Sequence, residues 1–282
     1  KGTYTIRLYP GGQLCSVPES LDAIRTGAVE AGMIPLGAFA GTVPEFGLPE
    51  LPFLFNNNEA NAYAMAGITE LRDQLLQKKC NQKCLGCIAV GTFQLLSRKK
   101  HIKTLDDFKG LIVGCDTPPM AAAIKALGGS AIIVDFTEDY SNLQKGVIDV
   151  KTSAPQYVLV AKLYEVAKYY TVCHMFSGLY AFTINLDLYN KMPEEIKTAL
   201  VQELGNTAKR ISQNYVDLFY KLEPILKEKG LQYYYLPPEE RNKWKEKTQA
   251  IISEAITKFG EVGIKFKKIV DEANAKYPYK LH

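Results

Sequence analysis

The segment Val43–Phe55 constrains the fold of this chain more than any other stretch. Its three prolines, Pro44, Pro49 and Pro52, exclude an α-helix and disfavour a central strand, because proline fixes φ and donates no hydrogen bond. It also carries seven large hydrophobic side chains: Val43, Phe46, Leu48, Leu51, Phe53, Leu54 and Phe55. A run this apolar must be covered by other parts of the protein. The segment is therefore either a buried crossover connection or a rigid wall beside a hinge or ligand cleft.

Strands and helices are predicted to alternate along the first half of the chain. The expected strands are Tyr4–Tyr9, Met33–Ile34, Cys84–Val90, Leu111–Gly114, Ala131–Asp135 and Ile148–Lys151. The expected helices are Pro18–Arg25, Asn58–Lys79, Pro119–Leu127, Thr137–Lys145 and Gln156–Val166, with a loop at Gly91–Lys103. Such alternation with short glycine turns predicts an α/β fold whose sheets are mostly parallel and covered by helices on both faces.

The pattern changes after Cys173. A strand at Ala181–Asn185 precedes a long run of helical periodicity, Pro193–Lys229, in which Pro224 is expected to kink or end the helix. A helix this long exceeds the width of one small domain and could lie across two. A strand at Leu231–Leu236 and two amphipathic helices, Pro238–Phe259 and Lys265–Tyr277, complete the chain.

Composition excludes several classes of protein. The 282 residues suffice for two domains, and 47% hydrophobic with 23% charged residues is typical of a globular protein with a real core. The net charge of +4 is too small and too dispersed to indicate binding to nucleic acid or an anionic membrane. No apolar run reaches the roughly 18 residues that span a bilayer.

The cysteines raise the question of a metal cluster. Cys80, Cys84 and Cys87 have a spacing that also occurs in iron–sulfur enzymes. Strand alternation, however, is expected to place Cys84 and Cys87 on opposite faces, which argues against a cluster. A local disulfide between Cys80 and Cys84 stays open, and Cys87, Cys115 and Cys173 are expected to be free buried thiols.

An ordered set of motifs resembles the extracytoplasmic solute-binding proteins of tripartite ATP-independent periplasmic (TRAP) transporters. The matching segments are Tyr9–Leu14, Ala28–Gly32, Val43–Phe55, Asp106–Leu111, Phe136–Tyr140 and Gly146–Asp149, followed by His174 and Asn185. The resemblance implies a two-domain periplasmic-binding-protein-like fold with a hinge and a long helix shared by both domains. The first domain would hold residues 1–93 and about 180–208, and the second residues 94–179 and about 209–282 with the C-terminal helices.

The same resemblance implies a function. The protein would capture a small ligand in the interdomain cleft, outside the cytoplasmic membrane in the periplasm after removal of a signal peptide. It would deliver the ligand to TRAP membrane permease subunits, docking peripherally at that membrane protein, with no catalysis, cofactor, metal or nucleic acid involved. The resemblance also implies a further strand and helix ahead of Tyr4–Tyr9.

The site departs from the family pattern at positions that usually carry charge. Gly114 and Phe93 stand where carboxylate-binding members of the family have arginines. Pro35 and Ala38 replace acidic or polar residues of the family. The polar segment that usually carries an asparagine in the family consists here of Lys151, Thr152 and Ser153. These departures favour a ligand that is aromatic, neutral or weakly acidic over a simple dicarboxylate.

The candidate site is otherwise aromatic and neutral. Its aromatic members are Phe39, Phe93, Phe136, Phe176 and Tyr180, each of which could equally be core packing. Its polar members are Gln94, Asp116, Thr117, Lys151, Thr152 and Ser153. Asp116 could equally be an acid of the turn before Pro118 or a ligand contact. Lys151 could supply the missing cation or be a solvated surface lysine.

The sequence leaves two other functions open. An enzyme on a similar scaffold would need an acid–base or nucleophile constellation or a phosphate loop, and no such motif is found. The sequence beside His174 shows no Ser, Cys or Asp that would make it a catalytic base, so His174 is expected to be structural. A ligand-sensing receptor of the same fold would show domain closure coupled to a different membrane partner.

Overall fold

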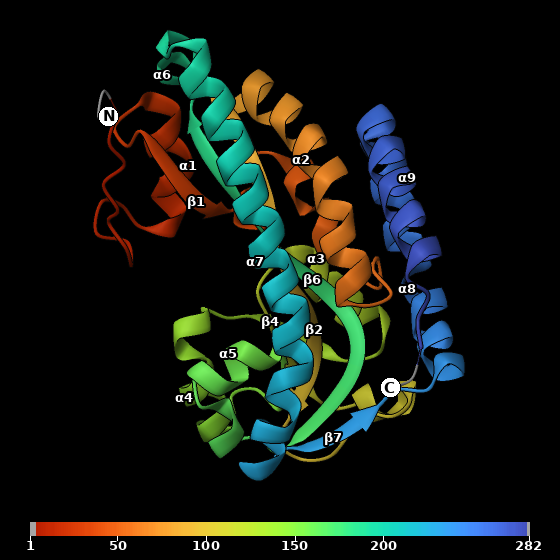
Figure 1. Ribbon diagram of the computed structural model, residues 1–282. Helices are drawn as coiled ribbons and strands as arrows, with labels where there is room; N and C mark the ends of the chain where they lie inside the picture. Colours follow the sequence, from red (N-terminus) through yellow and green to blue (C-terminus); the bar gives the residue numbers. More distant parts are fainter. Residues whose placement is uncertain (1–3, 281–282) are drawn as a thin grey trace.

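The computed structural model describes residues 4–280 and consists of one mixed sheet flanked by helices (Figure 1). The strands are β1 (Ala31–Pro35), β2 (Gln82–Ser97), β3 (Ile112–Cys115), β4 (Ser130–Ile133), β5 (Val150–Ser153), β6 (Tyr169–Asn185) and β7 (Gln232–Tyr235). The α-helices are α1 (Val17–Thr26), α2 (Asn58–Cys80), α3 (Pro118–Ala126), α4 (Asp139–Lys145), α5 (Pro155–Val160), α6 (Leu186–Lys191), α7 (Glu194–Glu228), α8 (Pro238–Lys258) and α9 (Gly260–Lys276). The 3-10 helices are η1 (Leu36–Phe39), η2 (Pro44–Glu50), η3 (Leu105–Phe108), η4 (Phe136–Glu138) and η5 (Leu163–Glu165).

Two long strands join the two ends of the molecule. The strand order is β1-β6-β2-β5-β3-β4, with β7 beside β6. β2 and β6 run antiparallel from the pair Gln82–Asn185 to the pair Ser97–Tyr169, so each contributes to both ends of the sheet. β3 is parallel to β4 and β5, and β7 is parallel to β6, whereas β1–β6 and β2–β5 are antiparallel. The α/β class is confirmed, and the strand pairing is mixed.

Helix α7 follows the two long strands over the length of the molecule (Figure 1). Its 35 residues match the expected long helix, which continues past Pro224 to Glu228 instead of ending there. It packs closely because Gly86 of β2 leaves room for it: a Cβ at Gly86 would lie 2.9 Å from the Cβ of Ala208. The Ser212 hydroxyl accepts a hydrogen bond from the N–H of Ala89 at 2.9 Å.

The segment Val43–Phe55 is buried except at Pro44, which is exposed, and Glu45, which is half-buried. All seven of its large hydrophobic side chains are at most 6% exposed, and Pro44–Glu50 forms η2. Side chains satisfy its backbone: the Arg72 guanidinium donates to the carbonyls of Glu45 and Phe46, and the Asn274 amide donates to that of Leu54. The prediction of a covered crossover connection is confirmed.

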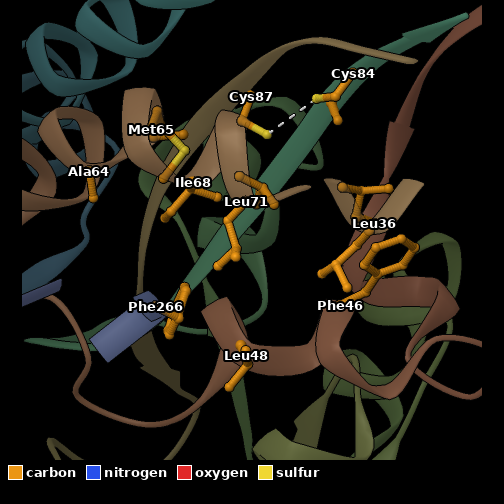
Figure 2. Packing of buried hydrophobic residues seen from close by; sticks show 14 of the residues in the cluster. Leu36, Phe46, Leu48, Ala64, Met65, Ile68, Leu71, Cys84, Cys87 and Phe266 are labelled. Carbon is orange, nitrogen blue, oxygen red and sulfur yellow. Dashed lines mark hydrogen bonds between the residues drawn. The ribbon is translucent and has the colours of Figure 1, made fainter. Parts of the chain in front are cut away.

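Around this segment lies the first hydrophobic cluster, formed by α1, η1, η2, α2, the first half of β2, the end of β6 and α9. Its members include Leu36, Phe46, Leu48, Ala64, Met65, Ile68, Leu71, Cys84, Cys87 and Phe266 (Figure 2). Two further clusters fill the other end of the sheet, one around Phe108 and Trp244 and one around Tyr170 and Leu226. α9 thus packs in the first cluster, although the sequence assigns the C-terminal helices to the second domain; the domain boundaries stay a prediction.

Three local expectations are wrong. Tyr4–Tyr9 forms no strand, and its apolar side chains are exposed (Ile6 70%, Leu8 83%), because within residues 4–280 no strand pairs with it. β2 continues through Gly91 to Ser97 where a loop was expected, because Gly91 adopts φ +89° and lets the strand resume its pairing with β6. Cys84 and Cys87 do not point to opposite faces, because a register shift between Cys84 and Gly86 inserts one residue into the strand.

Candidate ligand-binding site

The two long strands are irregular at the same level of the sheet. The register of β2 shifts between Ala89 and Thr92, and His174 in β6 has a φ of +48°. The Thr92 hydroxyl and His174 Nδ1 lie 2.6 Å apart. The side-chain oxygen of Gln94 (Oε1) accepts hydrogen bonds from the backbone N–H groups of Cys173 and His174 at 2.8 and 2.7 Å. Gln94 and His174 therefore hold the junction between the strands, as structural residues do.

Beside this junction lies a buried ion cluster, which we call the Lys151 cluster: Lys151, Asp116 and Asp139. Lys151 Nζ lies 2.5 Å from Asp116 Oδ1 and 3.2 Å from Asp139 Oδ1. The Lys151 side chain is 2% exposed and that of Asp139 is fully buried, whereas the Asp116 side chain is 36% exposed. One positive charge thus faces two carboxylates, and Asp116 is the member that reaches solvent.

Burial controls the protonation of this cluster. Burial raises the pKa of Asp139 to about 6, although Lys151 opposes the shift. Burial alone would lower the pKa of Lys151, but the two carboxylates outweigh it and hold that pKa above its ordinary value. Lys151 is therefore charged at neutral pH, and its charge is already compensated inside the protein.

A third carboxylate, Glu50 at the end of η2, comes from the opposite side of the junction. Burial raises its pKa to about 7; the charge of Asp116 adds to the shift, and the Thr117 hydroxyl and Arg72 oppose it. Its carboxylate lies against the backbone of η1, because a Cβ at Gly37 would be 1.6 Å from Glu50 Oε1. Glu50 Oε2 is buried with no hydrogen-bond partner among the described residues. Glu50 thus places an acceptor between η1 and the start of α3.

The structure gathers the predicted polar residues on neighbouring strands. Lys151 in β5 pairs with Gly114 in β3, and Ser153 pairs with Gln94 in β2. Thr117 stands at the N-cap position of α3, next to Asp116, and its side chain makes no capping hydrogen bond. The hydroxyls of Thr152 and Ser153 are buried and donate to nearby carbonyls, those of Gly114 and Ala154, over 3.5 and 3.4 Å.

The predicted aromatic residues are more scattered. Phe39 and Phe176 are 6% and 2% exposed and belong to the hydrophobic clusters, so they are core residues. Phe136 is 56% exposed, with its ring 6.3 Å from that of Tyr157. Tyr180 pairs with Pro35 at the end of β1. Burial raises the pKa of Tyr180, and the charges of Tyr215 and Asp116 add to the shift.

Apolar side chains pack at both positions where the family resemblance implies arginines. A Cβ at Gly114 would lie 2.7 Å from Ile148 Cδ1 and 3.2 Å from Val134 Cγ2, so apolar side chains already fill that space. Phe93 is half-buried against the second cluster, and its ring covers Gly178, where a Cβ would lie 2.9 Å from Phe93 Cζ.

Each buried cation of the described chain already has partners within the protein. Besides Lys151, the buried lysine and arginine side chains between residues 4 and 280 are Arg72 and Arg241. Arg72 donates to the carbonyls of Glu45 and Phe46. Arg241 donates to those of Cys173 and Phe55 and stacks over Tyr279. Among the nitrogens of these three buried cations, Arg72 Nε is the one that is buried without a hydrogen-bond partner in the described part of the chain.

Sequence reasoning missed Glu50, Asp139 and Tyr157. Asp139 looks like an ordinary first-turn acid of a helix, and Tyr157, whose hydroxyl donates to the Phe136 carbonyl, looks like a surface tyrosine. Glu50 carried a signal, because it is an acid between Leu48 and Leu51 in a segment whose large hydrophobic side chains are all buried.

The described residues offer no other chemistry at this place. Between residues 4 and 280, no group of three His, Cys, Asp or Glu side chains could hold a metal ion. Over the same range, no helix is long and apolar enough to cross a bilayer. A two-part α/β scaffold crossed by two long strands, with polar side chains at their junction, is the architecture of a solute-binding receptor.

Comparisons with known proteins agree with this class. Residues 1–258 match the family described as bacterial extracellular solute-binding protein, family 7. The C4-dicarboxylate-binding periplasmic protein DctP of Rhodobacter capsulatus is 26% identical over 265 residues, which cover 92% of this chain and 78% of the relative. The 2,3-diketo-L-gulonate-binding periplasmic protein YiaO of Escherichia coli K12 is 28% identical over 218 residues, covering 75% and 66% of the two chains.

Solved structures share the fold. A Bordetella pertussis extracytoplasmic solute receptor that binds pyroglutamic acid superposes with a TM-score of 0.82 at 20% identity, over 92% of this chain and 86% of its own. A marine metagenome TRAP solute-binding protein specific for aromatic acid ligands gives 0.80 at 20% identity, over 93% and 85%. The chain belongs to the bacterial extracellular solute-binding protein family 7 and is a solute-binding protein of the TRAP type, not an enzyme.

Proposed function

We propose that this protein captures a small organic ligand that is aromatic, neutral or weakly acidic, in a cleft between two domains. One observation carries the proposal: every buried lysine and arginine of the described chain is already paired or bonded to backbone carbonyls. A ligand carboxylate held without a cation would lose its hydration without compensation.

The groups that remain at the site are hydrogen-bond acceptors and rings. Asp116 is partly exposed, Glu50 Oε2 is buried without a partner among the described residues, and Tyr180 pairs with Pro35 at the end of β1. Carboxylates accept hydrogen bonds from hydroxyl, amide or ammonium groups, and a phenol ring offers a stacking face. The ligand would accordingly bear hydrogen-bond donors beside an apolar or aromatic part.

The same proposal includes a hinge at the junction of the long strands. Gly91 in β2 and His174 in β6 are irregular, and two register shifts flank the pairs Thr92–Ser177 and Phe93–Phe176 between them. This part of the long strands provides the place where two halves of the sheet would rotate. The first half would be built on the first hydrophobic cluster and the second half on the other two. Glu50 and Thr117 come from opposite sides of the junction and already interact in this structure, because the Thr117 hydroxyl opposes the rise in the pKa of Glu50.

Delivery to a TRAP membrane permease from the periplasm completes the proposed function. Its support is membership of the family together with the printed functions of relatives, two of which are periplasmic binding proteins.

A ligand screen tests the proposal. Thermal shift over neutral aromatic solutes, hydroxylated solutes, aromatic acids, sugar acids and dicarboxylates would select candidates for calorimetry. We expect stoichiometric binding in the neutral or aromatic classes, weakened at least tenfold by Asp116→Ala. The control Asp106→Ala, whose side chain is 81% exposed beside Lys109, should bind as the parent does. Absence of binding in every class, or equal effects of the two variants, would overturn the proposal.

A further inference from the structure

Two thiols meet on one side of β2. Cys84 and Cys87 are separated in sequence by Leu85 and Gly86, and their sulfur atoms lie 3.9 Å apart (Figure 2). The register shift between Cys84 and Gly86 brings this about: Cys84 pairs with Thr183 and Cys87 with Ala181, two positions apart on β6. Side chains two positions apart share a face of a strand.

Helix α2 fixes the backbone of both cysteines. Asp73 accepts a hydrogen bond from the N–H of Cys84 and Thr69 one from that of Cys87, each at 2.9 Å. These bonds replace a neighbouring strand at this edge of β2. The bulge is thus held in the geometry that keeps the two thiols together.

We propose that Cys84 and Cys87 form a disulfide that closes a ring across the bulge of β2 when the chain folds in an oxidising compartment. The sulfurs need to approach from 3.9 Å to a bond length of about 2.0 Å, which side-chain rotation within the bulge can supply. Nothing in the solute-binding function requires this bond, so it is a separate property of the protein.

The oxidant is a low-molecular-weight disulfide or a protein dithiol oxidase acting by thiol–disulfide exchange. One cysteine thiolate attacks a sulfur of the oxidant and releases one thiol, leaving a mixed disulfide. The second cysteine thiolate then attacks the protein-bound sulfur and releases the second thiol. In sum the two cysteine thiols lose two protons and two electrons, and the oxidant's disulfide is reduced to two thiols.

In the folded protein the two thiols differ in pKa. Hydrogen bonds from Cys84 and Thr69, together with the Arg72 guanidinium, lower the pKa of Cys87 despite its burial. The same contact with Cys87, and burial, raise the pKa of Cys84. Both sulfurs are buried in the first hydrophobic cluster, so exchange precedes closure of that cluster over β2. Once formed, the bond is shielded from reductants.

Peptide mapping tests the proposal without ambiguity about the partner. The full chain is exported to the periplasm of a bacterial host, denatured with an alkylating reagent present, and digested with trypsin. Cleavage after Lys79, Lys83 and Arg98 places Cys80 in residues 80–83 and both Cys84 and Cys87 in residues 84–98. A disulfide between Cys84 and Cys87 therefore leaves these two peptides separate, whereas any bond to Cys80 joins them.

We expect peptide 84–98 to be unalkylated and two hydrogen atoms lighter than its reduced form, and to take up two alkyl groups after reduction. Cys87→Ser should leave Cys84 alkylated, and Cys115→Ser, a buried thiol elsewhere in the sheet, should leave the bond intact. Alkylation of both Cys84 and Cys87 in the exported parent chain, or peptide 84–98 joined to peptide 80–83, would overturn the proposal.

Discussion

Removing Lys151 should uncover two buried or partly buried negative charges. In Lys151→Met the fully buried Asp139 loses a partner at 3.2 Å and Asp116 loses one at 2.5 Å. Removing one partner of a buried ion pair lowers the free energy of unfolding by about 3–5 kcal/mol, because the remaining charge keeps its desolvation penalty without compensation. We expect a loss of stability in this range at pH 7.5.

The loss should depend on pH. The pKa of Asp139 is already raised to about 6 with Lys151 present, and it rises further without that cation. A carboxyl with a raised folded-state pKa keeps its proton in the folded protein after the unfolded chain has lost it, so stability falls as pH rises from the ordinary value through the folded value. At pH 5 Asp139 is protonated in the variant, and the loss should be smaller.

Urea unfolding at pH 5 and pH 7.5, followed by circular dichroism, measures both effects. Lys125→Met, which removes an exposed lysine of α3, is the matched control and should stay within about 0.5 kcal/mol of the parent. The double variant Lys151→Met/Asp139→Leu should recover part of the loss by removing the uncompensated charge. A loss below about 1 kcal/mol, or one equal at the two pH values, would refute the reasoning about the Lys151 cluster.

Two further predictions concern Glu50. Gly37→Ala should destabilise the fold by about 1–3 kcal/mol in urea unfolding, because the new Cβ would lie 1.6 Å from the Glu50 carboxylate. The control Gly41→Ala, whose Cβ would have nothing within 4 Å, should leave the stability unchanged. Equal losses in the two variants would contradict the packing of Glu50 against Gly37. Since the folded-state pKa of Glu50 is raised from 4.5 to about 7, the parent should lose stability as pH rises through that window. Glu50→Gln should remove this loss, so the free energy of unfolding of the variant minus that of the parent should increase by about 3 kcal/mol at most from pH 4.5 to pH 8. A difference that stays constant with pH would contradict the burial of Glu50.

The parts of the fold with strong local patterns were predictable. The three- and four-residue spacing of apolar residues gave α7, and the proline-rich run Val43–Phe55 is buried as its hydrophobic content required. Tyr4–Tyr9 shows the limit of such patterns, because a strand depends on a partner that alternation alone does not supply. The bulge at Cys84–Gly86 depends on contacts with α2 and α7 that no local pattern reveals.

The site was predictable only in part. Lys151, Asp116 and Thr117 follow strand ends, where polar residues of an α/β sheet gather, and they lie together as expected. Lys151 is buried and not solvated, because Asp139 from α4 meets it there, a contact between distant segments. The packing of Ile148 and Val134 against Gly114 likewise depends on tertiary structure, and it explains in physical terms how the space for an arginine is filled.

Calorimetry on a matched ligand pair tests the central claim most directly. An aromatic solute with hydroxyl or amide donors and no carboxylate is compared with a C4-dicarboxylate at the same pH and ionic strength. The account predicts stoichiometric binding of the neutral aromatic solute, and dicarboxylate binding at least tenfold weaker, because the buried cations of the described chain are already committed. Tighter binding of the dicarboxylate, abolished by Lys151→Met, would contradict it.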